Sequence, residues 1–378
     1  MAEKYQICKY CVMDTSDPVI SFNDQGVCNH CEGFRARKDW FPGDSGKNKL
    51  NALIDSIKGE GRGKEYDCIL GLSGGVDSSY LALKAYEWGL RPLVFHVDAG
   101  WNSELAVANI EKVVKHCGYD LHTHVVDWET MRGLHLAFMN AGIANQDIPQ
   151  DHIFLSSQYH FAIKNNIRTI LSGGNLATES IFPTSWHNDA MDSINLLDIH
   201  KKYAGGKPKN YQTISMFEYY FWYPIVLKMR TVRPLNFMDF NKEAAIGVLE
   251  DVIGWRSYGR KHGESIFTKL FQNYILPTRF GYDKRRPHLS SLIVSGQMTR
   301  TQAENELLKP LYDANELEQD IEYFCKKLRI ERAEFEDFMT APLRSYKEFR
   351  NWDRKQRAIK FIQNGAERIT GKRLRVYS

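Results

Sequence analysis

The feature that most constrains this chain is a glycine-rich turn, Ser73–Ser79, which lies between a predicted strand and a predicted helix. The preceding run Tyr66–Leu72 is apolar and β-prone, and apolar residues recur at helical spacing from Asp77 onward. Two adjacent glycines, Gly74 and Gly75, allow the backbone to turn its N–H groups and the helix N-terminus toward one concavity. Because unpaired donors and the helix dipole both attract anions, the turn predicts a phosphate-binding site.

Three other interpretations of this turn compete with phosphate binding. A Walker A loop is excluded, because no G-x-x-x-x-G-K-[ST] pattern occurs in the chain. The stretch Gly71–Gly75 satisfies G-x-S-x-G, the nucleophile elbow of a serine hydrolase, but it leaves Asp77, Ser78 and Ser79 unexplained. A purely structural strand-to-helix turn is the third interpretation. Phosphate binding accounts for the most residues of the turn.

The chain continues with alternating strand and helix patterns. Further strands are predicted at Pro92–Val97, Leu121–Val126 and Thr169–Leu171. This order predicts an α/β fold in which a parallel sheet carries helices on both faces. Ligands in such sheets bind beyond the carboxyl ends of the strands, where Asp98–Asn102 and Ser172–Glu179 join the glycine turn.

Four of the seven cysteines form two C-x-x-C pairs near the N-terminus. Cys8 and Cys11 are separated by sixteen residues from Cys28 and Cys31, a spacing typical of a Cys₄ zinc site. Because four sulfurs leave no open coordination position, we expect a structural zinc ion. His30 is a possible substitute ligand, and a surface histidine beside the site is the alternative.

Composition sets broad limits on the function. The chain has 378 residues and a net charge of +4, so a nucleic-acid partner is permitted but not required. No apolar run approaches membrane-spanning length, and the N-terminus lacks the apolar core of a signal peptide. We therefore expect a cytoplasmic protein with no membrane span. The small net charge gives no reason to expect a nucleic-acid partner, and we expect none.

A second candidate site lies in the far half of the chain. Lys284, Arg285 and Arg286 form a basic run, and arginine suits bidentate binding of phosphate or carboxylate. Trp186 and His187 follow a proline in a predicted loop, where an aromatic ring can pack on a sugar. A solvated basic face and a core role for Trp186 remain alternatives. The basic tail Arg368–Arg375 is expected to be solvated.

Two of these stretches resemble known nucleotide-binding motifs. SGGVDSS resembles the pyrophosphate loop of the ATP pyrophosphatase superfamily, which splits ATP between its α and β phosphates and has an adenine nucleotide alpha hydrolase-like fold. Ser172–Glu179 is similar to the second nucleotide motif of GMP and NAD synthetases. The resemblance implies that Asp77 and Glu179 hold magnesium. It also implies an ATP and pyrophosphate site made by Ser73, Gly74, Gly75, Asp77, Ser78, Ser79, Asp98, Gly173 and Asn175.

Longer stretches resemble one family more closely. Asn175–Asn188 and Thr268–Thr299, together with the zinc ribbon and the glycine turn, look like the bacterial N-acetyl sugar amidotransferases. These enzymes make acetamidino sugars for lipopolysaccharide O-antigens and flagellar glycans. The resemblance implies an ATP-dependent, AMP-forming carbon–nitrogen ligase that adenylates the N-acetyl oxygen of a nucleotide-activated sugar. From the residue types alone, we expect Lys284 to assist catalysis and either Lys284 or Arg285 to stabilise the departing pyrophosphate. Trp186, His187, Arg285 and Arg286 are the expected sugar-binding residues.

The source of ammonia is expected to lie outside this chain. None of Cys68, Cys117 and Cys325 stands in the Gly-x-Cys-x-Gly turn of a glutaminase elbow, and all three are predicted to be core thiols. The resemblance implies separate glutaminase and cyclase-like subunits. We expect a zinc ribbon at residues 1–45, an ATP pyrophosphatase domain at 46–240 and a mainly helical substrate or partner region at 241–378.

Other functions remain open from the sequence. A tRNA-thiolating enzyme would share the pyrophosphate loop but commonly needs a sulfur-carrying cysteine and a basic surface. A non-enzymatic nucleotide-binding adaptor would bind ATP without releasing pyrophosphate. A serine hydrolase would use Ser73 as its nucleophile.

Overall fold

The computed structural model describes residues 5–37, 39–259 and 263–370. A five-stranded sheet forms its centre, in the order β3-β2-β1-β4-β5. The strands are β1 (Cys68–Gly71), β2 (Pro92–Asp98), β3 (Leu121–Val125), β4 (Thr169–Leu171) and β5 (Arg230–Val232). Every neighbouring pair is parallel, with register partners such as Ile69↔Leu93 and Ile69↔Ile170. The predicted parallel sheet is confirmed.

The chain order reverses at β1, because β2 lies on one side of it and β4 on the other. Such a reversal opens a crevice at the carboxyl ends of the two strands. The glycine turn follows β1, and Ser172–Glu179 follows β4. Both predicted nucleotide segments therefore meet at this crevice.

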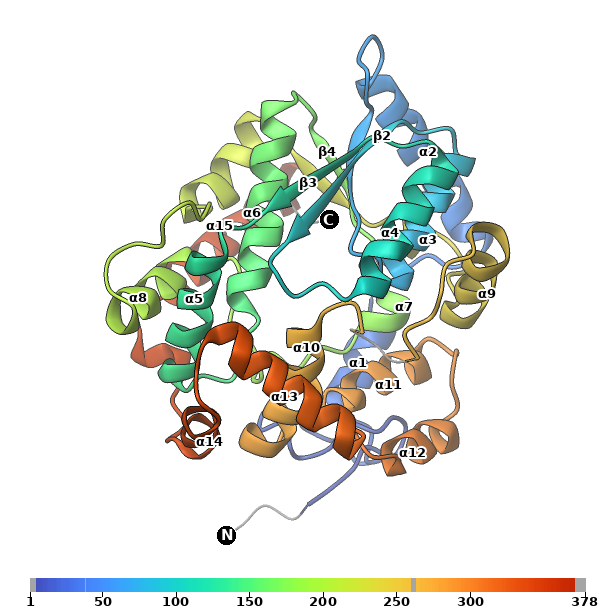
Figure 1. Ribbon diagram of the computed structural model, residues 1–378. Helices are drawn as coiled ribbons and strands as arrows, with labels where there is room; N and C mark the ends of the chain where they lie inside the picture. Colours follow the sequence, from blue (N-terminus) through green and yellow to red (C-terminus); the bar gives the residue numbers. More distant parts are fainter. Residues whose placement is uncertain (1–4, 38, 260–262, 371–378) are drawn as a thin grey trace.

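Helices cover both faces of the sheet (Figure 1). Alternating side chains divide the core: Leu70 and Val94 face one layer, whereas Ile69 and Phe95 face the other. The first layer contains α2 (Asp44–Glu60), α3 (Val76–Glu87), α4 (Glu104–Cys117) and α9 (Lys242–Ile253). The second layer contains α5 (Trp128–Ala141), α6 (Ile148–Lys164), α8 (Ser193–Tyr203) and the π-helix η1 (Glu218–Val226).

The chain beyond the sheet is helical, as expected. It comprises α10 (Ile266–Leu270), η3 (Phe271–Phe280), α11 (Arg285–Val294), α12 (Arg300–Leu308), α13 (Ala314–Leu328), α14 (Arg332–Thr340), η4 (Tyr346–Glu348) and α15 (Asp353–Thr370). Short elements α7 (Leu176–Glu179) and η2 (Pro234–Phe237) follow β4 and β5. Within the described residues, no helix has the length and apolar character needed to cross a membrane. Most of the basic tail Arg368–Arg375 lies outside the described residues.

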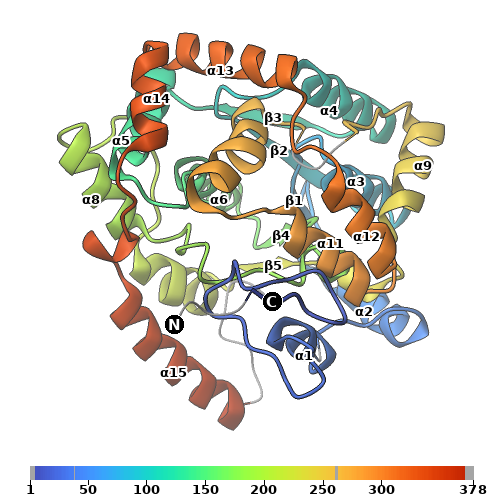
Figure 2. The ribbon, with the colours of Figure 1, turned by 90° about the horizontal axis from the view of Figure 1, so that it is seen from below.

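The N-terminal segment with α1 (Asn29–Arg35) packs under α11 and α12 (Figure 2). Its four cysteines share a small apolar core with Ile181, Leu289 and Ile293. This contact links the first residues of the chain to the loop that follows α7.

Candidate active site

The glycine turn is fixed in place by groups far away in the sequence. Gly74 has a φ of +84°, and a Cβ added there would lie 2.8 Å from the Ala106 carbonyl oxygen. The Gly74 carbonyl accepts hydrogen bonds from Trp255 Nε1 at 3.0 Å and from the Tyr258 hydroxyl at 2.9 Å. Only glycine fits this position without strain.

The serines of the turn differ in their surroundings. Ser73 is exposed, and its Oγ lies 3.1 Å from Ser78 Oγ and 3.3 Å from the Gly75 nitrogen. Ser79 is fully buried in α3, and within the described residues its hydroxyl has no hydrogen-bond partner. The turn therefore presents Ser73 and the start of α3 outward while Ser79 points into the protein.

A second turn closes against the first. A Cβ at Gly173 would lie 2.8 Å from the carbonyl carbon of Asp77 and 2.8 Å from the nitrogen of Ser78, so the two backbones touch. Asn175 Nδ2 donates to Asp77 Oδ1 at 3.2 Å, and Asn175 Oδ1 caps α7 by accepting from the Thr178 nitrogen. Glu179 ends this short helix with an exposed side chain.

Asp77 and Glu179 are suitable ligands for a magnesium ion. Asn175 holds the Asp77 carboxylate on one side of the second turn. A Cβ added at Gly174, in the same turn, would lie 3.7 Å from Glu179 Oε2. Carboxylate oxygens around one glycine turn match the hard-oxygen preference of magnesium.

Asp98 and its neighbour His96 have different roles at the end of β2. The Asp98 carboxylate accepts from the Gly100 nitrogen at 2.7 Å and does not line the cavity described below. His96 does line it; its Nδ1 donates to the Leu72 carbonyl at 2.9 Å and its Nε2 accepts from Asn102 Nδ2 at 2.9 Å. Burial lowers the pKa of His96, which keeps the ring neutral in this arrangement.

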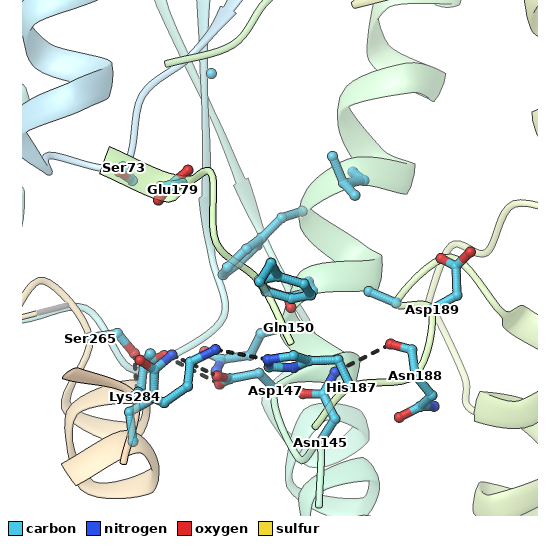
Figure 3. Close-up of a pocket in the computed structure, with 18 of the residues that line it drawn as sticks. Ser73, Asn145, Asp147, Gln150, Glu179, His187, Asn188, Asp189, Ser265 and Lys284 are labelled. Atoms are coloured by element: carbon cyan, nitrogen blue, oxygen red, sulfur yellow. Dashed lines mark hydrogen bonds between the residues drawn. The ribbon is translucent and has the colours of Figure 1, made fainter. Parts of the chain in front are cut away.

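A cavity of about 980 Å³ begins at these two turns. Ser73 and Glu179 lie at one side of it, and Asp147, His187 and Lys284 lie at another (Figure 3). Gln356 and Lys360 of α15 line it as well. The volume is within the range of ligand pockets in proteins, at its upper end.

Lys284 and His187 meet in the cavity as a pair. Lys284 Nζ lies 2.9 Å from His187 Nε2, and the lysine is only 7% exposed. The His187 ring stacks on Phe182 with centroids 4.1 Å apart, and Lys284 Nζ lies 5.0 Å from the centroid of the same ring. Burial, together with the Lys284 charge, holds the pKa of His187 well below its usual value. His187 is therefore neutral and accepts from the ammonium group.

Two aspartates at the start of α6 complete this wall, and the sequence analysis did not predict them. Asp147 accepts hydrogen bonds from Gln150, Thr268 and Gln272 at 3.3–3.4 Å. Asp151 lines the cavity. Its side chain is exposed to the space inside the cavity, and the surrounding protein shields it from bulk solvent. The helix α6 begins just after Asp147 and has Pro149 in its first turn. The carboxylates of Asp147 and Asp151 lie four residues apart in the sequence. That spacing was the signal available in the sequence.

The other predicted sugar-binding residues lie away from the cavity. Arg285 forks onto the Asp283 carboxylate at 2.8–3.1 Å, and Arg286 pairs with Asp14 at 3.0 Å. Trp186 is 1% exposed and stacks on Tyr282 with centroids 4.8 Å apart. None of Trp186, Arg285 and Arg286 lines the cavity. Of the five residues predicted in this half of the chain, only Lys284 and His187 line it.

The four N-terminal cysteines form a compact, buried cluster that fits zinc. The sulfur pairs Cys8–Cys31, Cys11–Cys28 and Cys28–Cys31 lie 3.9, 3.7 and 3.6 Å apart. A tetrahedron of zinc–sulfur bonds places the sulfurs about 3.8 Å apart, so the cluster has the size of a Cys₄ zinc site. His30 Nε2 instead lies 2.7 Å from Asp17 Oδ2.

The cysteine cluster supports the loop that carries His187. Ser185 Oγ donates to Asp17 Oδ1, and Trp186 Nε1 donates to the Ser16 carbonyl at 3.4 Å. Arg286 Nη1 donates to the Val12 carbonyl at 2.8 Å. The zinc ribbon therefore packs behind one wall of the cavity without lining it with its cysteines.

Comparison with known proteins gives one family match and a set of distant structures. Residues 264–363 match the model of a family described as LPS biosynthesis protein WbpG-like, C-terminal domain. No curated protein matches the chain.

Among solved structures, the chain is similar to ammonia-dependent NAD synthetase from Campylobacter jejuni, with 12% identity, 79% of this chain and 97% of that chain covered, and a TM-score of 0.32. NAD⁺ synthetase from Burkholderia pseudomallei shares 16% identity over 81% of this chain and 97% of its own, with a TM-score of 0.31. NMN synthetase from Francisella tularensis shares 14% identity, and the match covers 59% of this chain and 90% of that chain, with a TM-score of 0.30.

Proposed function

We propose that this protein is an ATP-dependent amidotransferase that converts an N-acetyl group of a nucleotide-activated sugar into an acetamidino group. One observation carries the proposal: a single cavity joins the glycine turn at Ser73 to residues of the segment that matches the lipopolysaccharide-biosynthesis family, among them Lys284 and Gln356. The phosphate-binding turn and the family-matched helices thus face one space.

The chemistry explains why ATP is needed. An amide oxygen leaves poorly, so the acetyl oxygen first attacks the α-phosphate of ATP, and the bond to pyrophosphate breaks. Ammonia then adds to the imidate carbon, and the carbon–oxygen bond breaks to release AMP. The nitrogen brings three hydrogens and keeps two in the amidinium product, so one proton is released.

The roles of the residues follow from this sequence of steps. The backbone N–H groups after Ser73 and the N-terminus of α3 would bind the phosphates. Asp77 and Glu179 would hold a magnesium ion, which supplies charge neutralisation at the phosphates. Lys284, held by His187, would face the transferring group from the opposite wall.

Zinc, partners and location complete the proposal. The Cys₄ site would be structural, because four sulfurs close the coordination shell. Separate glutaminase and cyclase-like subunits would supply ammonia. The reaction would take place in the cytoplasm, where ATP and nucleotide sugars are available. The boundaries at residues 45 and 240 remain our proposed division of the chain.

The cysteines argue against the thiolating alternative. Cys68, Cys117 and Cys325 are all buried, and none of them lines the cavity. Burial raises the pKa of all three thiols, to about 11 for Cys117, which disfavours the thiolate needed to carry sulfur. Among the described residues, the Ser73 hydroxyl contacts Ser78 and the Gly75 nitrogen rather than a histidine base, which argues against the serine-hydrolase alternative.

Mass spectrometry of the products tests the proposal. The protein is incubated with ATP, magnesium, ammonium chloride and a panel of UDP-linked diacetamido uronic acids, CMP-linked nonulosonic acids and N-acetylfucosamine-type sugar nucleotides. We expect AMP and pyrophosphate, together with the small mass decrease that replacement of oxygen by NH produces in one sugar. Formation of ADP, or ATP cleavage with every sugar unchanged, would contradict the proposal.

A further inference from the structure

Asp151 differs from every other carboxylate described above, because its side chain enters the cavity without a hydrogen-bond partner among the described residues. Its neighbour Asp147 is held by Gln150, Thr268 and Gln272. Asp98 and Asp77 are held by Gly100 and Asn175. A carboxylate enclosed by protein but left open on the cavity side is available to a bound molecule.

Its position matches a need of the proposed reaction. The neutral acetamido group becomes a cationic amidinium, and the attacking nitrogen must lose one proton. An enclosed carboxylate both stabilises a developing positive charge and accepts a proton far better than water does. Lys284 and the phosphate-binding turns instead carry groups suited to anions.

We propose that Asp151 is the catalytic base of the amidation step: its carboxylate accepts the proton that ammonia loses as the new carbon–nitrogen bond forms. This inference rests on the proposed function and adds a residue to it. In the step, the nitrogen lone pair forms the bond to the imidate carbon. One N–H bond breaks with its proton passing to Asp151, and the carbon–oxygen bond breaks with AMP leaving.

The charged groups around Asp151 support this role. Burial raises the pKa of Asp151, the like charge of Asp147 raises it further, and Lys284 lowers it. Tyr211 is the other titratable group that interacts with Asp151; its hydroxyl donates to the Pro149 carbonyl, and its own pKa is raised well above 10 by burial, so it stays neutral. A base is most effective when its pKa lies near the working pH, and a raised carboxylate pKa moves Asp151 in that direction.

The test separates the two half-reactions of the full-length protein. In the absence of ammonia, sugar-dependent exchange of labelled pyrophosphate into ATP reports adenylation. With ammonium chloride added, amidine formation reports the second step. The probe is a UDP-linked diacetamido uronic acid, and the variant is Asp151→Asn, which keeps the side-chain size.

We expect Asp151→Asn to retain pyrophosphate exchange and to slow amidine formation by about a hundredfold or more, the usual contribution of a general base. Asp251→Asn removes an exposed carboxylate from α9 and serves as the matched control, with both rates unchanged. Circular dichroism and thermal unfolding verify that each variant is folded.

The pH profile gives a second readout. Because the base must be ionised, the amidation rate of the wild type rises with pH through the raised pKa of Asp151. Asp147→Asn removes a like charge and should shift the rise of the amidation rate to lower pH. Lys284→Met removes an opposite charge and should shift this rise to higher pH. A comparison at fixed concentration of unprotonated ammonia removes the titration of the nucleophile itself.

Three outcomes separate the inference from the proposal beneath it. Equal amidation by Asp151→Asn and wild type, with the same pH profile, would overturn the role of Asp151. Loss of exchange and amidation together in a folded variant would also overturn it, because Asp151 would then act in adenylation or binding. Absence of sugar-dependent exchange in the wild type would instead refute the proposed function.

Discussion

At the scale of single residues, glycines determine how closely the turn after β1 and the turn after β4 approach each other. Gly74 adopts a left-handed conformation under the carbonyl of Ala106, and Gly173 presses its backbone on Asp77 and Ser78. The glycine-rich motif predicted a tight turn at Gly74, but not its contact with Ala106. It could not predict that Trp255 and Tyr258, nearly two hundred residues away, hold the Gly74 carbonyl.

Gly173→Ala tests this close approach. The added methyl group would lie 2.8 Å from two backbone atoms at the start of α3, so one turn must move away from the other. We expect ATP cleavage to fall by about a hundredfold, since shifts of about 1 Å at an active site can have that effect. Sugar-dependent pyrophosphate exchange measures the change.

Gly247→Ala in α9 is the matched control, because no atom lies within 4 Å of its added Cβ. It should leave the exchange rate unchanged and raise the free energy of unfolding by about 0.5–1 kcal/mol, the helix preference of alanine over glycine. Wild-type exchange by Gly173→Ala would contradict the account of the paired turns.

Residue patterns predicted the basic run at Lys284 only in part. The run was predicted to bind phosphate or carboxylate, but its three members contact different partners. Arg285 forms an ion pair with the nearby Asp283, whereas Arg286 forms an ion pair with Asp14, which is 272 residues away in the sequence. Sequence spacing cannot distinguish a cation that faces a cavity from one that joins two segments, because partners distant in the chain make the choice.

At the scale of elements, the strand pattern gave four of the five strands. β5 (Arg230–Val232) was missed because Arg-Thr-Val contains one apolar residue, whereas the equally short β4 contains two. Its place is set by pairing with β4, for example Ile170↔Thr231. The sequence did not identify the start of α6 as part of a site. Its aspartates lie in the cavity wall only because the fold brings Thr268 next to Asp147 and Lys284 near Asp151.

The zinc ribbon acts as a support for the loop between α7 and α8. Its Asp17 binds Ser185, and its Asp14 binds Arg286, so the ribbon spans the loop and α11. Removal of zinc should therefore weaken binding of the sugar nucleotide more than binding of ATP, because the two glycine turns contact α3, α4 and the segment after α9 instead of the ribbon. Structural zinc sites contribute directly to folding, so prolonged chelation should also lower thermal stability.

Metal analysis and steady-state kinetics check this prediction. We expect one zinc ion per chain, a larger rise in KM for the sugar nucleotide than for ATP after partial chelation, and recovery on addition of zinc. A protein that is folded and fully active without zinc would refute the structural role of the cluster.

At the scale of the whole molecule, three parts of the chain converge on one cavity. The crevice of the sheet supplies the two glycine turns, the loop beyond α7 supplies His187, and the C-terminal helices supply Lys284, Gln356 and Lys360. The sequence predicted the sheet and the ribbon, because their signals are local. The meeting of the parts depends on tertiary packing, and only the structure reveals it.

The transfer of the acetyl oxygen tests the central claim most directly. A sugar nucleotide whose N-acetyl oxygen carries a heavy isotope is converted with ATP and ammonium chloride, and the AMP formed is analysed by mass spectrometry. Adenylation of that oxygen predicts that the label appears in the phosphate of AMP and is absent from pyrophosphate. Unlabelled AMP formed alongside the amidine would contradict the account, because the acetyl oxygen would then never have been bound to the α-phosphate.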